Sequence, residues 1–350
     1  MTTLRTLRNK SAHPSGHKPS PEEARFIFFE TINRFLSQPI LSTTQLVDEL
    51  ISRLKNTNFF PSIVVSDIKS VVGDETKNLH DEAIPQLVAK LVSAVASSET
   101  SIKNNSSLFL VGIATHDKLA TISALQAKLI APKADDNGYE DLITQVLSAN
   151  GKIFVGLNET TVNRIRAVLA KKIADTTNAV SESKLAHPTT ALISIAAAVA
   201  EGQFVTTFKS ELEALFEKRA HSKFVVKLVQ DKPSLLSLYF PLLLAKAGSS
   251  DYATANAFSN AVESLDQALS VLLSGEQAFE LIIAIKKAAS WGAWSATGVA
   301  TAKFAGTPLL RANALSYVSA NKAAAAEKIE QKLSESKPID DFIKASLTDE

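Results

Sequence analysis

Cysteine is absent from the 350 residues of this chain, and methionine occurs once, at Met1. Without a thiol the chain has no disulfide, no thiolate nucleophile and no cysteine-ligated metal. A groove lined by flexible methionine side chains is excluded for the same reason. The most apolar stretches, residues 190–200 and 235–245, are shorter than the roughly 18 residues that cross a bilayer. We therefore expect buried helices there and no membrane span.

Glycine-rich phosphate loops and metal motifs are also missing. Gly151 and Gly156 are five residues apart, but no third glycine and no Gly-Lys-Ser/Thr follows them, so the sequence predicts no nucleotide-binding loop. His13 and His17 have the spacing of ligands on a helix, but a proline and a glycine lie between them. Neither a G-x-S-x-G elbow nor an H-E-x-x-H pair occurs.

The paired acids Asp135–Asp136 and Asp340–Asp341 are the strongest candidates for acid–base chemistry. Such chemistry needs carboxylates in a cleft, where their pKa values separate. Both pairs fall in expected loops or tails, where solvated charge is the simpler interpretation. We therefore predict no catalytic residue, no cofactor, no metal site and no small-molecule substrate, and we expect that the chain is not an enzyme. An enzyme with dispersed catalytic residues is kept as a third hypothesis.

Positive and negative charges are segregated along the chain. Lysine and arginine number 37 and aspartate and glutamate 36, which gives a net charge of +1. Nevertheless, residues 1–21 and 281–326 contain no acidic residue. A polyanion responds to the local field rather than to the net charge, so these two segments are the best candidates for contact with nucleic acid.

Helical periodicity dominates the rest of the chain and predicts an all-α fold. Serine followed three residues later by glutamate or glutamine, the capping-box pattern, begins a helix at Ser20, Ser42 and Ser274. Residues 62–66 and 152–155 are short β-branched stretches, and we do not expect a sheet from them. The predicted helices cover 84–97, 108–130, 139–149, 159–178, 189–200, 204–220, 223–229, 235–247, 252–273, 276–289 and 309–334.

The pattern predicts a multi-helix body with flexible ends. We expect a disordered basic arm at 1–20, an N-terminal helical lobe at 21–131, a C-terminal helical lobe at 152–334 and an acidic flexible tail at 335–350, with a short docked helix at 339–347 as an option. The turn-forming residues within 132–151 indicate either a hinge between two lobes or a surface loop of one domain. No internal period of the length that marks a solenoid is visible.

The basic arm is the first candidate for nucleic-acid binding. A disordered cationic segment can follow phosphates without a fixed geometry, and its binding weakens as salt rises. An ordinary flexible terminus is the alternative. The arm's cations are Arg5, Arg8, Lys10 and Lys18.

A stripe of three cations is the second candidate. Arg219, Lys223 and Lys227 are spaced by four residues, so a single helix across them would place all three on one face. The alternative is an ordinary solvated helix face.

The acid-free segment near the C-terminus is the third candidate. Its cations Lys286, Lys287, Lys303 and Arg311 are interleaved with Trp291 and Trp294. Bases stack on aromatic rings while cations hold the backbone, so this mixture suits single-stranded nucleic acid. Alternatively, both tryptophans fill the core.

In composition and layout the chain resembles the coat and nucleocapsid proteins of RNA viruses, especially those of plants and fungi. The resemblance is carried by the arm cations from Arg5 to Lys18 and by the segment from Lys286 to Arg311. It implies a structural protein that packages or coats RNA through phosphate contacts and assembles with copies of itself through exchanged arms. The near-neutral charge departs from that pattern and leaves a shell protein as plausible as a nucleocapsid.

The alternative is a cellular helical scaffold or adaptor whose partners are proteins. Residues 1–20 have no apolar core of a secretory signal, but they have the arginine- and serine-containing, acid-free composition of a mitochondrial transit peptide. We therefore expect a cytoplasmic protein, or a virion component if it is viral, with the mitochondrial matrix as the alternative. The expected partners are the chain itself and RNA.

Overall fold

All regular structure in the described chain is helical. The structure is a computed structural model, which describes residues 20–31, 42–77, 79–134, 136, 138–175, 184–290, 307–333 and 339–348. No strand occurs among these residues, so the predicted all-α class is confirmed. Residues 1–19 of the predicted basic arm lie outside the described residues.

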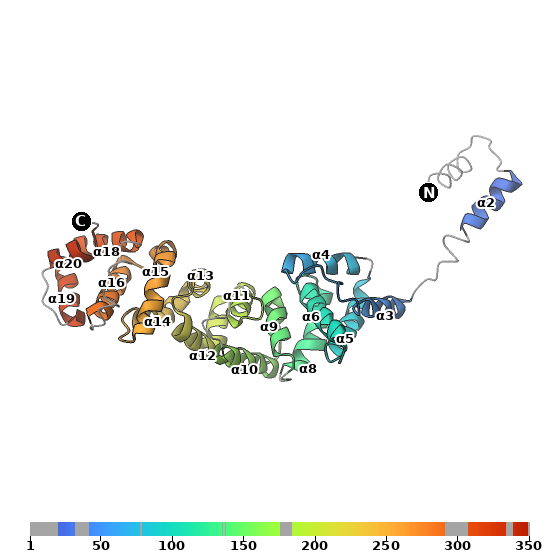
Figure 1. The fold of residues 1–350 in the computed structure, drawn as a ribbon, viewed down its shortest axis with the longest axis horizontal. Coiled ribbons are helices and arrows are strands. Elements are labelled where there is room, and N and C mark those ends of the chain that lie inside the picture. Colours follow the sequence, from blue (N-terminus) through green and yellow to red (C-terminus); the bar gives the residue numbers. More distant parts are fainter. Residues whose placement is uncertain are drawn as a thin grey trace.

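The α-helices are numbered as in Figure 1. They are α2 (Pro21–Thr31), α3 (Thr43–Arg53), α4 (Val65–Thr76), α5 (Ile84–Val95), α6 (Thr100–Ala114), α7 (Leu119–Leu125), α8 (Ala131–Lys133), α9 (Glu140–Ala149), α10 (Glu159–Asp175), α11 (Pro188–Ala198), α12 (Glu201–Arg219), α13 (Lys223–Asp231), α14 (Leu236–Ala247), α15 (Tyr252–Leu272), α16 (Gly275–Ser290), α18 (Pro308–Ala320), α19 (Lys322–Leu333) and α20 (Ile339–Ser346). Short 3-10 turns form η2 (Asp81–Ala83), η4 (Gly151–Phe154) and η5 (Pro233–Leu235), and a π turn forms η3 (Gln126–Ile130).

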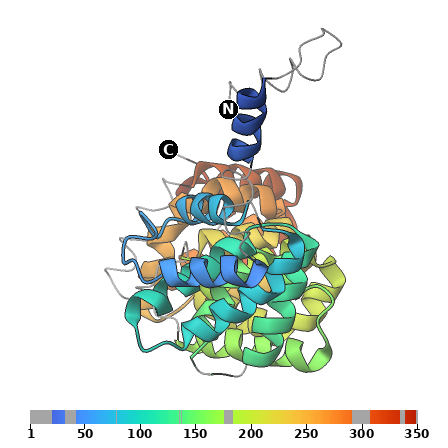
Figure 2. The same cartoon turned by 90° about the vertical axis from the view of Figure 1, so that its right-hand side faces the viewer.

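The helices form an elongated stack (Figure 1), which Figure 2 shows end-on. Helices that are close in the chain pack side by side in two rows. One row runs through α4, α6, α9, α11, α13, α15 and α18, and the other through α10, α12, α14 and α16. This is the arrangement of an α-solenoid, in which each element contacts only its neighbours.

The helices stack although the sequence has no visible internal period of the length that marks a solenoid. Helical hairpins of similar length can stack whenever each presents apolar side chains inward, whichever residues supply them. One buried apolar cluster accordingly extends from Val47 in α3 to Leu347 after α20. Within the predicted hinge 132–151, α9 contacts both α6 and α11. The division into two lobes stays a prediction.

Two predicted helices are each divided into two. The helix predicted over 108–130 is interrupted after α6, where the Thr115 hydroxyl donates to the Gly112 carbonyl at 2.7 Å. The helix predicted over 309–334 is interrupted at Asn321, whose side-chain amide donates to the Tyr317 carbonyl at 3.0 Å. In both places a polar side chain donates to a carbonyl of the preceding helical turn.

The capping-box predictions are confirmed at all three serines. The Ser20 hydroxyl accepts from the backbone N–H of Glu23, and the Glu23 carboxylate accepts from the backbone N–H of Ser20. The same reciprocal pair begins α3 at Ser42 and α16 at Ser274. These caps satisfy backbone donors that a helix leaves free at its N-terminus.

A buried carboxylate joins α15 to α18. Asp266, 6% exposed, accepts from the backbone N–H groups of Leu309 and Leu310 at 3.0 and 2.9 Å. These groups lie in the first turn of α18, where the helix dipole favours negative charge. Asp266 therefore anchors the beginning of α18 across 43 residues of chain.

The C-terminal tail ends in a helix that is packed on the stack. Residues 339–346 form α20, and Phe342 on this helix is 3% exposed. The option of a short docked helix is therefore realised, whereas residues 334–338 and 349–350 lie outside the described part. Among the described helices, none combines the length and the apolar character that a membrane span requires.

Candidate functional site

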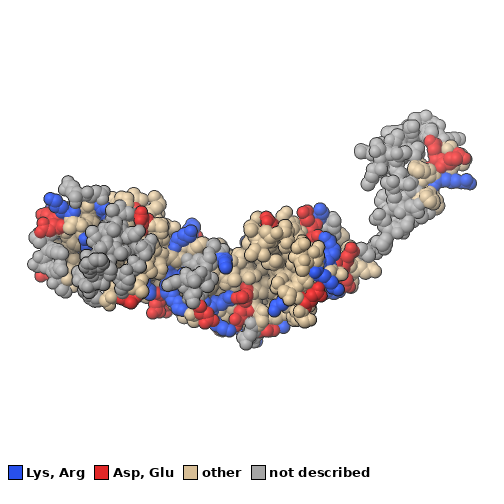
Figure 3. Space-filling model, viewed as in Figure 1, with Lys and Arg blue, Asp and Glu red and all other residues tan. Residues whose placement is uncertain are grey.

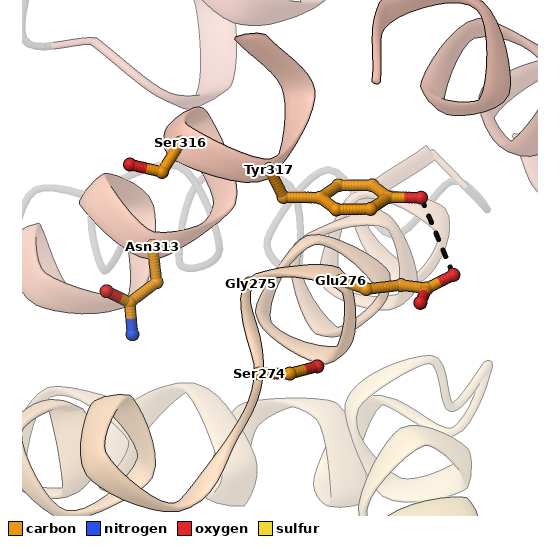
Figure 4. Close-up of a pocket in the computed structure, with 6 residues that line it drawn as sticks. All are labelled: Ser274, Gly275, Glu276, Asn313, Ser316 and Tyr317. Atoms are coloured by element: carbon orange, nitrogen blue, oxygen red, sulfur yellow. Dashed lines mark hydrogen bonds between the residues drawn. The ribbon is translucent and has the colours of Figure 1, made fainter. Parts of the chain in front are cut away.

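A pocket lies where the N-terminus of α16 meets α18 (Figure 4). Its volume is about 550 Å³. The lining contains one carboxylate and no imidazole. Its residues are Ser274, Gly275, Glu276, Asn313, Ser316 and Tyr317.

Several polar groups of this pocket are engaged in contacts within the chain. The Glu276 carboxylate accepts from the Tyr317 hydroxyl at 3.5 Å and from Lys328 Nζ at 2.5 Å. The hydrogen bond from Lys328 is the main reason why the pKa of Glu276 is lowered. The Asn313 side-chain amide donates to the Ser270 carbonyl at 2.8 Å. These bonds hold α15, α16, α18 and α19 together.

Gly275 explains how closely α16 and α18 approach at this point. A Cβ atom there would lie 2.9 Å from the backbone oxygen of Asn313 and 3.1 Å from the Tyr317 Cβ. Only glycine allows this approach without a shift of the backbone. With one carboxylate, already paired to a lysine, the pocket assembles no acid–base pair. We interpret it as a junction between helices.

A smaller pocket of about 330 Å³ lies between α3 and α4. Its centre is a bidentate ion pair, in which Arg53 donates to both carboxylate oxygens of Glu75 at 2.7 and 2.6 Å. The Arg53 guanidinium also lies 5.9 Å from the ring centroid of Phe59. This pair fastens the end of α3 to α4.

Titratable side chains form no metal site in the described residues, where no group of three histidines or acids is within reach of one ion. The histidine most affected by its surroundings is His187, which is 1% exposed and caps α11 by accepting from the Thr189 N–H. Burial, reinforced by the positive charges of Arg219 and Lys172, lowers the pKa of His187 to about 4. It is therefore neutral near pH 7 and adds no cation for phosphate.

Seven of the predicted nucleic-acid residues cannot be placed. They are Arg5, Arg8, Lys10, Lys18, Trp291, Trp294 and Lys303, which lie outside the described residues.

The expectation of one helix face carrying Arg219, Lys223 and Lys227 is wrong. α12 ends at Arg219 and α13 begins at Lys223, because the Ser222 hydroxyl caps the new helix by accepting from the Phe224 N–H at 3.1 Å. Arg219 is 8% exposed, so it is part of the interior. Lys227 is exposed but paired with Asp231 at 2.6 Å.

The cations of the C-terminal segment also differ in how far their side chains are exposed. Lys286 and Lys287 are half-buried on α16. Arg311 on α18 is only 4% exposed, so the prediction that it contacts phosphate at the surface is wrong. Nothing in the sequence indicated this burial, because an arginine in an acid-free segment has the same pattern whether its side chain is buried or exposed.

Ion pairs are spread over the visible surface. In Figure 3 the blue and red side chains lie close to one another and form no broad field of one sign. Lys171 with Glu140 and Lys90 with Asp48 are examples. Such mixed surfaces screen a polyanion from the individual cations.

Three phenylalanine side chains on α2 form a largely exposed apolar surface. Phe26, Phe28 and Phe29 are 45%, 68% and 63% exposed, and α2 stands clear of the stack (Figure 1). The sequence analysis did not predict that these side chains would be uncovered. The available signal was the unbroken run from Phe26 to Phe29, which has no polar side.

Comparison with protein-family models, with curated proteins and with solved structures finds no match to this chain.

Proposed function

We propose that this protein is a structural protein that assembles with copies of itself and contacts RNA through its basic N-terminal residues. The observation that carries the proposal is α2, a capped helix whose phenylalanines are exposed in the single chain. Large exposed apolar groups of this kind mark surfaces that meet another macromolecule. The charged side chains of the two pockets, Glu276, Arg53 and Glu75, are engaged within the chain, which favours a structural role over a catalytic one.

Burial of α2 in a contact would contribute a substantial free energy. Fully covering a phenylalanine side chain contributes about 1.5–3 kcal/mol. Three such side chains on one helix can offset much of the entropy lost when two chains associate. A concentration-dependent assembly is therefore expected of the isolated protein.

In this proposal the residues that precede α2 contact the RNA. Arg5, Arg8, Lys10 and Lys18 are followed directly by this helix, so an assembly made through α2 would gather many basic segments. Phosphate contacts of each segment are individually weak, but they add up when several segments meet one strand. This arrangement supplies a more concentrated positive charge than the mixed face seen in Figure 3 does.

Sedimentation tests the proposed self-assembly, and absorbance tests the proposed RNA contact. We expect the purified chain to sediment as a large species that carries RNA, with a raised ratio of absorbance at 260 to 280 nm. Phe28→Ser with Phe29→Ser should give a monomer with the same helical circular dichroism. Arg5→Glu with Arg8→Glu should remove RNA, whereas Lys209→Glu, an exposed control on α12, should not. A wild-type chain that stays monomeric at high concentration would refute the proposed function.

The second candidate function is a scaffold that binds other proteins. It is favoured by the paired cations of the stack, such as Lys227 with Asp231 and Lys171 with Glu140. A surface of this kind suits protein partners better than a polyanion. A monomeric wild-type chain without RNA would support this candidate over the first.

A further inference from the structure

The pocket between α3 and α4 contains a flat cation in a fixed orientation. The guanidinium edge of Arg53 donates to both carboxylate oxygens of Glu75. One face of the same guanidinium lies over the ring of Phe59, with Cζ 5.9 Å from the ring centroid. The Arg53 side chain is nevertheless 53% exposed. Because a guanidinium is planar, its edge and one face are occupied, and its second face is left for a ligand.

Aromatic rings hold this plane in place. The ring of Phe59 meets the ring of Phe60 edge-on, with the centroids 5.0 Å apart, and its centroid lies 6.1 Å from that of Phe109. Both Phe60 and Phe109 are buried, so this aromatic cluster belongs to the core. A binding group that is fixed before its ligand arrives loses little entropy on binding. The open face of Arg53 is therefore a rigid stacking surface.

Hydrogen-bonding groups lie beside this surface. The loop after α3 is fixed because the buried Asn105 amide donates to the carbonyls of Leu54 and Asn56 at 2.9 and 2.8 Å. The Asn56 side chain in turn accepts from the backbone N–H of Asn58 at 3.0 Å. Asn58 lines the pocket, and its own side-chain amide makes no hydrogen bond within the described chain. It therefore offers a donor and an acceptor side by side.

These groups suit an unpaired nucleobase better than a phosphate. The charge of Arg53 is balanced by Glu75, whereas a base stacks on a guanidinium plane and pairs its edge with an asparagine amide. The pocket volume of about 330 Å³ lies in the range of about 300–1,000 Å³ that is usual for small-molecule sites. Lys55, in the same loop, is exposed and has no ion pair within the described residues, so it is available to a flanking phosphate.

We infer that the pocket between α3 and α4 binds one unpaired base of single-stranded RNA, which stacks on Arg53 and hydrogen-bonds to Asn58. The inference rests on the proposed RNA contact and adds a base contact to the phosphate contacts. Adenine is the expected base, because a carboxamide matches its neighbouring donor and acceptor. Among the described helices α3 follows α2, so a strand held by the basic N-terminal residues can also place a base in this pocket.

Binding of a labelled single-stranded oligoadenylate tests the pocket, with inorganic polyphosphate as a ligand that has phosphates and no bases. Arg53→Lys keeps the charge but removes the plane, and Asn58→Ala removes the amide. Each change should weaken oligoadenylate binding about tenfold, as expected for the loss of one base contact. Polyphosphate binding should stay unchanged. The slope of log affinity against log salt should also stay unchanged, because no phosphate contact is lost.

Arg166→Lys is the matched control. Arg166 on α10 likewise donates to both carboxylate oxygens of a glutamate, Glu211, and this variant should bind oligoadenylate like the wild type. Circular dichroism checks that the helices of each variant are intact. If Arg53→Lys lost helical signal, Asn58→Ala would decide alone, because it changes an exposed loop residue.

The outcomes separate this inference from the proposed function. Wild-type affinity for oligoadenylate in both pocket variants would overturn the inference and leave the proposed function standing. An equal loss of polyphosphate binding would overturn it as well, because the pocket would then act through charge. Arg5→Glu with Arg8→Glu should weaken the binding of both ligands and flatten the salt dependence. A wild type that binds neither ligand would remove the inference together with the proposed RNA contact.

Discussion

The two short helices at the ends of the described chain have opposite relations to the stack. Phe342 on α20 is 3% exposed and meets the ring of Phe279 edge-on, with the centroids 5.7 Å apart. Phe28 and Phe29 on α2 are more than half exposed. The same residue type therefore fastens one end of the chain to its own stack and leaves the other end with an uncovered surface.

The sequences of the two helices account for the difference. In α20 the acids Asp340 and Asp341 point to solvent, while Phe342 and Ser346, four residues apart, face inward. One apolar side is enough to pack against one surface. In α2 the apolar residues are consecutive, so no orientation of the helix on a single surface covers them all. The comparison suggests that α20 stabilises the monomer and that α2 serves association.

The largest expected effect follows from removing the α20 anchor. Phe342→Ala leaves a cavity beside Phe279, and a change of this kind costs about 3–5 kcal/mol. Because α20 is a short helix, we expect it to detach rather than the whole stack to unfold. Hydrogen exchange should show lost protection of the amides in 339–348.

Phe28→Ala is the matched change in α2. It removes a side chain that is 68% exposed, so the free energy of unfolding of the monomer should change by less than about 0.5 kcal/mol. Assembly should weaken instead. If Phe28→Ala destabilised the monomer as much as Phe342→Ala does, the contrast between the two helices would be lost.

Acid offers a way to weaken the stack without changing either end helix. The pKa of His187 is lowered to about 4 in the folded chain by burial and by Arg219 and Lys172, below its ordinary value of about 6.5. Its contribution is therefore complete above pH 6.5 and is lost as the pH falls toward 4. At pH 5 the loss should be about 2 kcal/mol.

Denaturant unfolding between pH 7 and pH 5 measures this effect. His187→Asn keeps a side-chain acceptor for the Thr189 N–H and should reduce the slope of stability against pH. Burial also lowers the pKa values of His116 and His221, so part of the slope should remain. An unchanged slope in His187→Asn would contradict the assignment.

A smaller effect is expected from Lys328, which ties α19, the helix before α20, to α16. Burial opposes its charge, but hydrogen bonds to Glu276 and Glu280 prevail and raise the pKa of Lys328 to about 12 from 10.5. This stabilisation is present below pH 10.5 and is lost as the pH rises toward 12. Lys328→Gln should cost about 1–2 kcal/mol at pH 8.

Lys332→Gln is the control for this change, because Lys332 lies 3.6 Å from Glu280 and is 42% exposed. Its cost should be below about 0.5 kcal/mol. Thermal unfolding at pH 8 and at pH 11 compares the two variants. Equal losses in the free energy of unfolding of the two variants would show that the attachment of α19 to α16 does not depend on Lys328.

The smallest expected effect concerns the cap of α2. Ser20→Ala removes the acceptor of the Glu23 N–H, which lies 3.1 Å from the hydroxyl, and should destabilise the helix by about 1 kcal/mol. Assembly should then weaken about fivefold, as measured by sedimentation. Ser42→Ala removes the equivalent cap of α3 and should lower the stability of the stack without changing assembly. Equal assembly of the two variants would argue against α2 as the contact.

Local signals allowed much of the fold to be predicted. The three capping boxes depend on residues three positions apart, so they can be read directly from the chain. The stack itself could not be predicted, because it depends on how hairpins with different residues fit one another. The breaks at Thr115 and Asn321 were missed because the apolar spacing that predicted a single helix continues across each of them.

The candidate site was less predictable than the fold. Segregated charge suggested phosphate contacts, but charge alone does not reveal that Arg219 and Arg311 are buried. The run from Phe26 to Phe29 indicates an apolar helix surface, but an apolar run does not reveal whether the same chain or another chain covers it. Contacts between chains are not encoded in the period of a single helix.

Asp266 helps to hold the molecule together if its backbone is cut between α16 and α18. Its carboxylate holds the first turn of α18 from α15, and Gly275 brings α16 against the same helix. Two contacts therefore bridge the stretch of backbone between residues 290 and 307. A chain cut anywhere in that stretch should keep both fragments together and migrate as two bands only after denaturation, much as a nicked enzyme retains its shape.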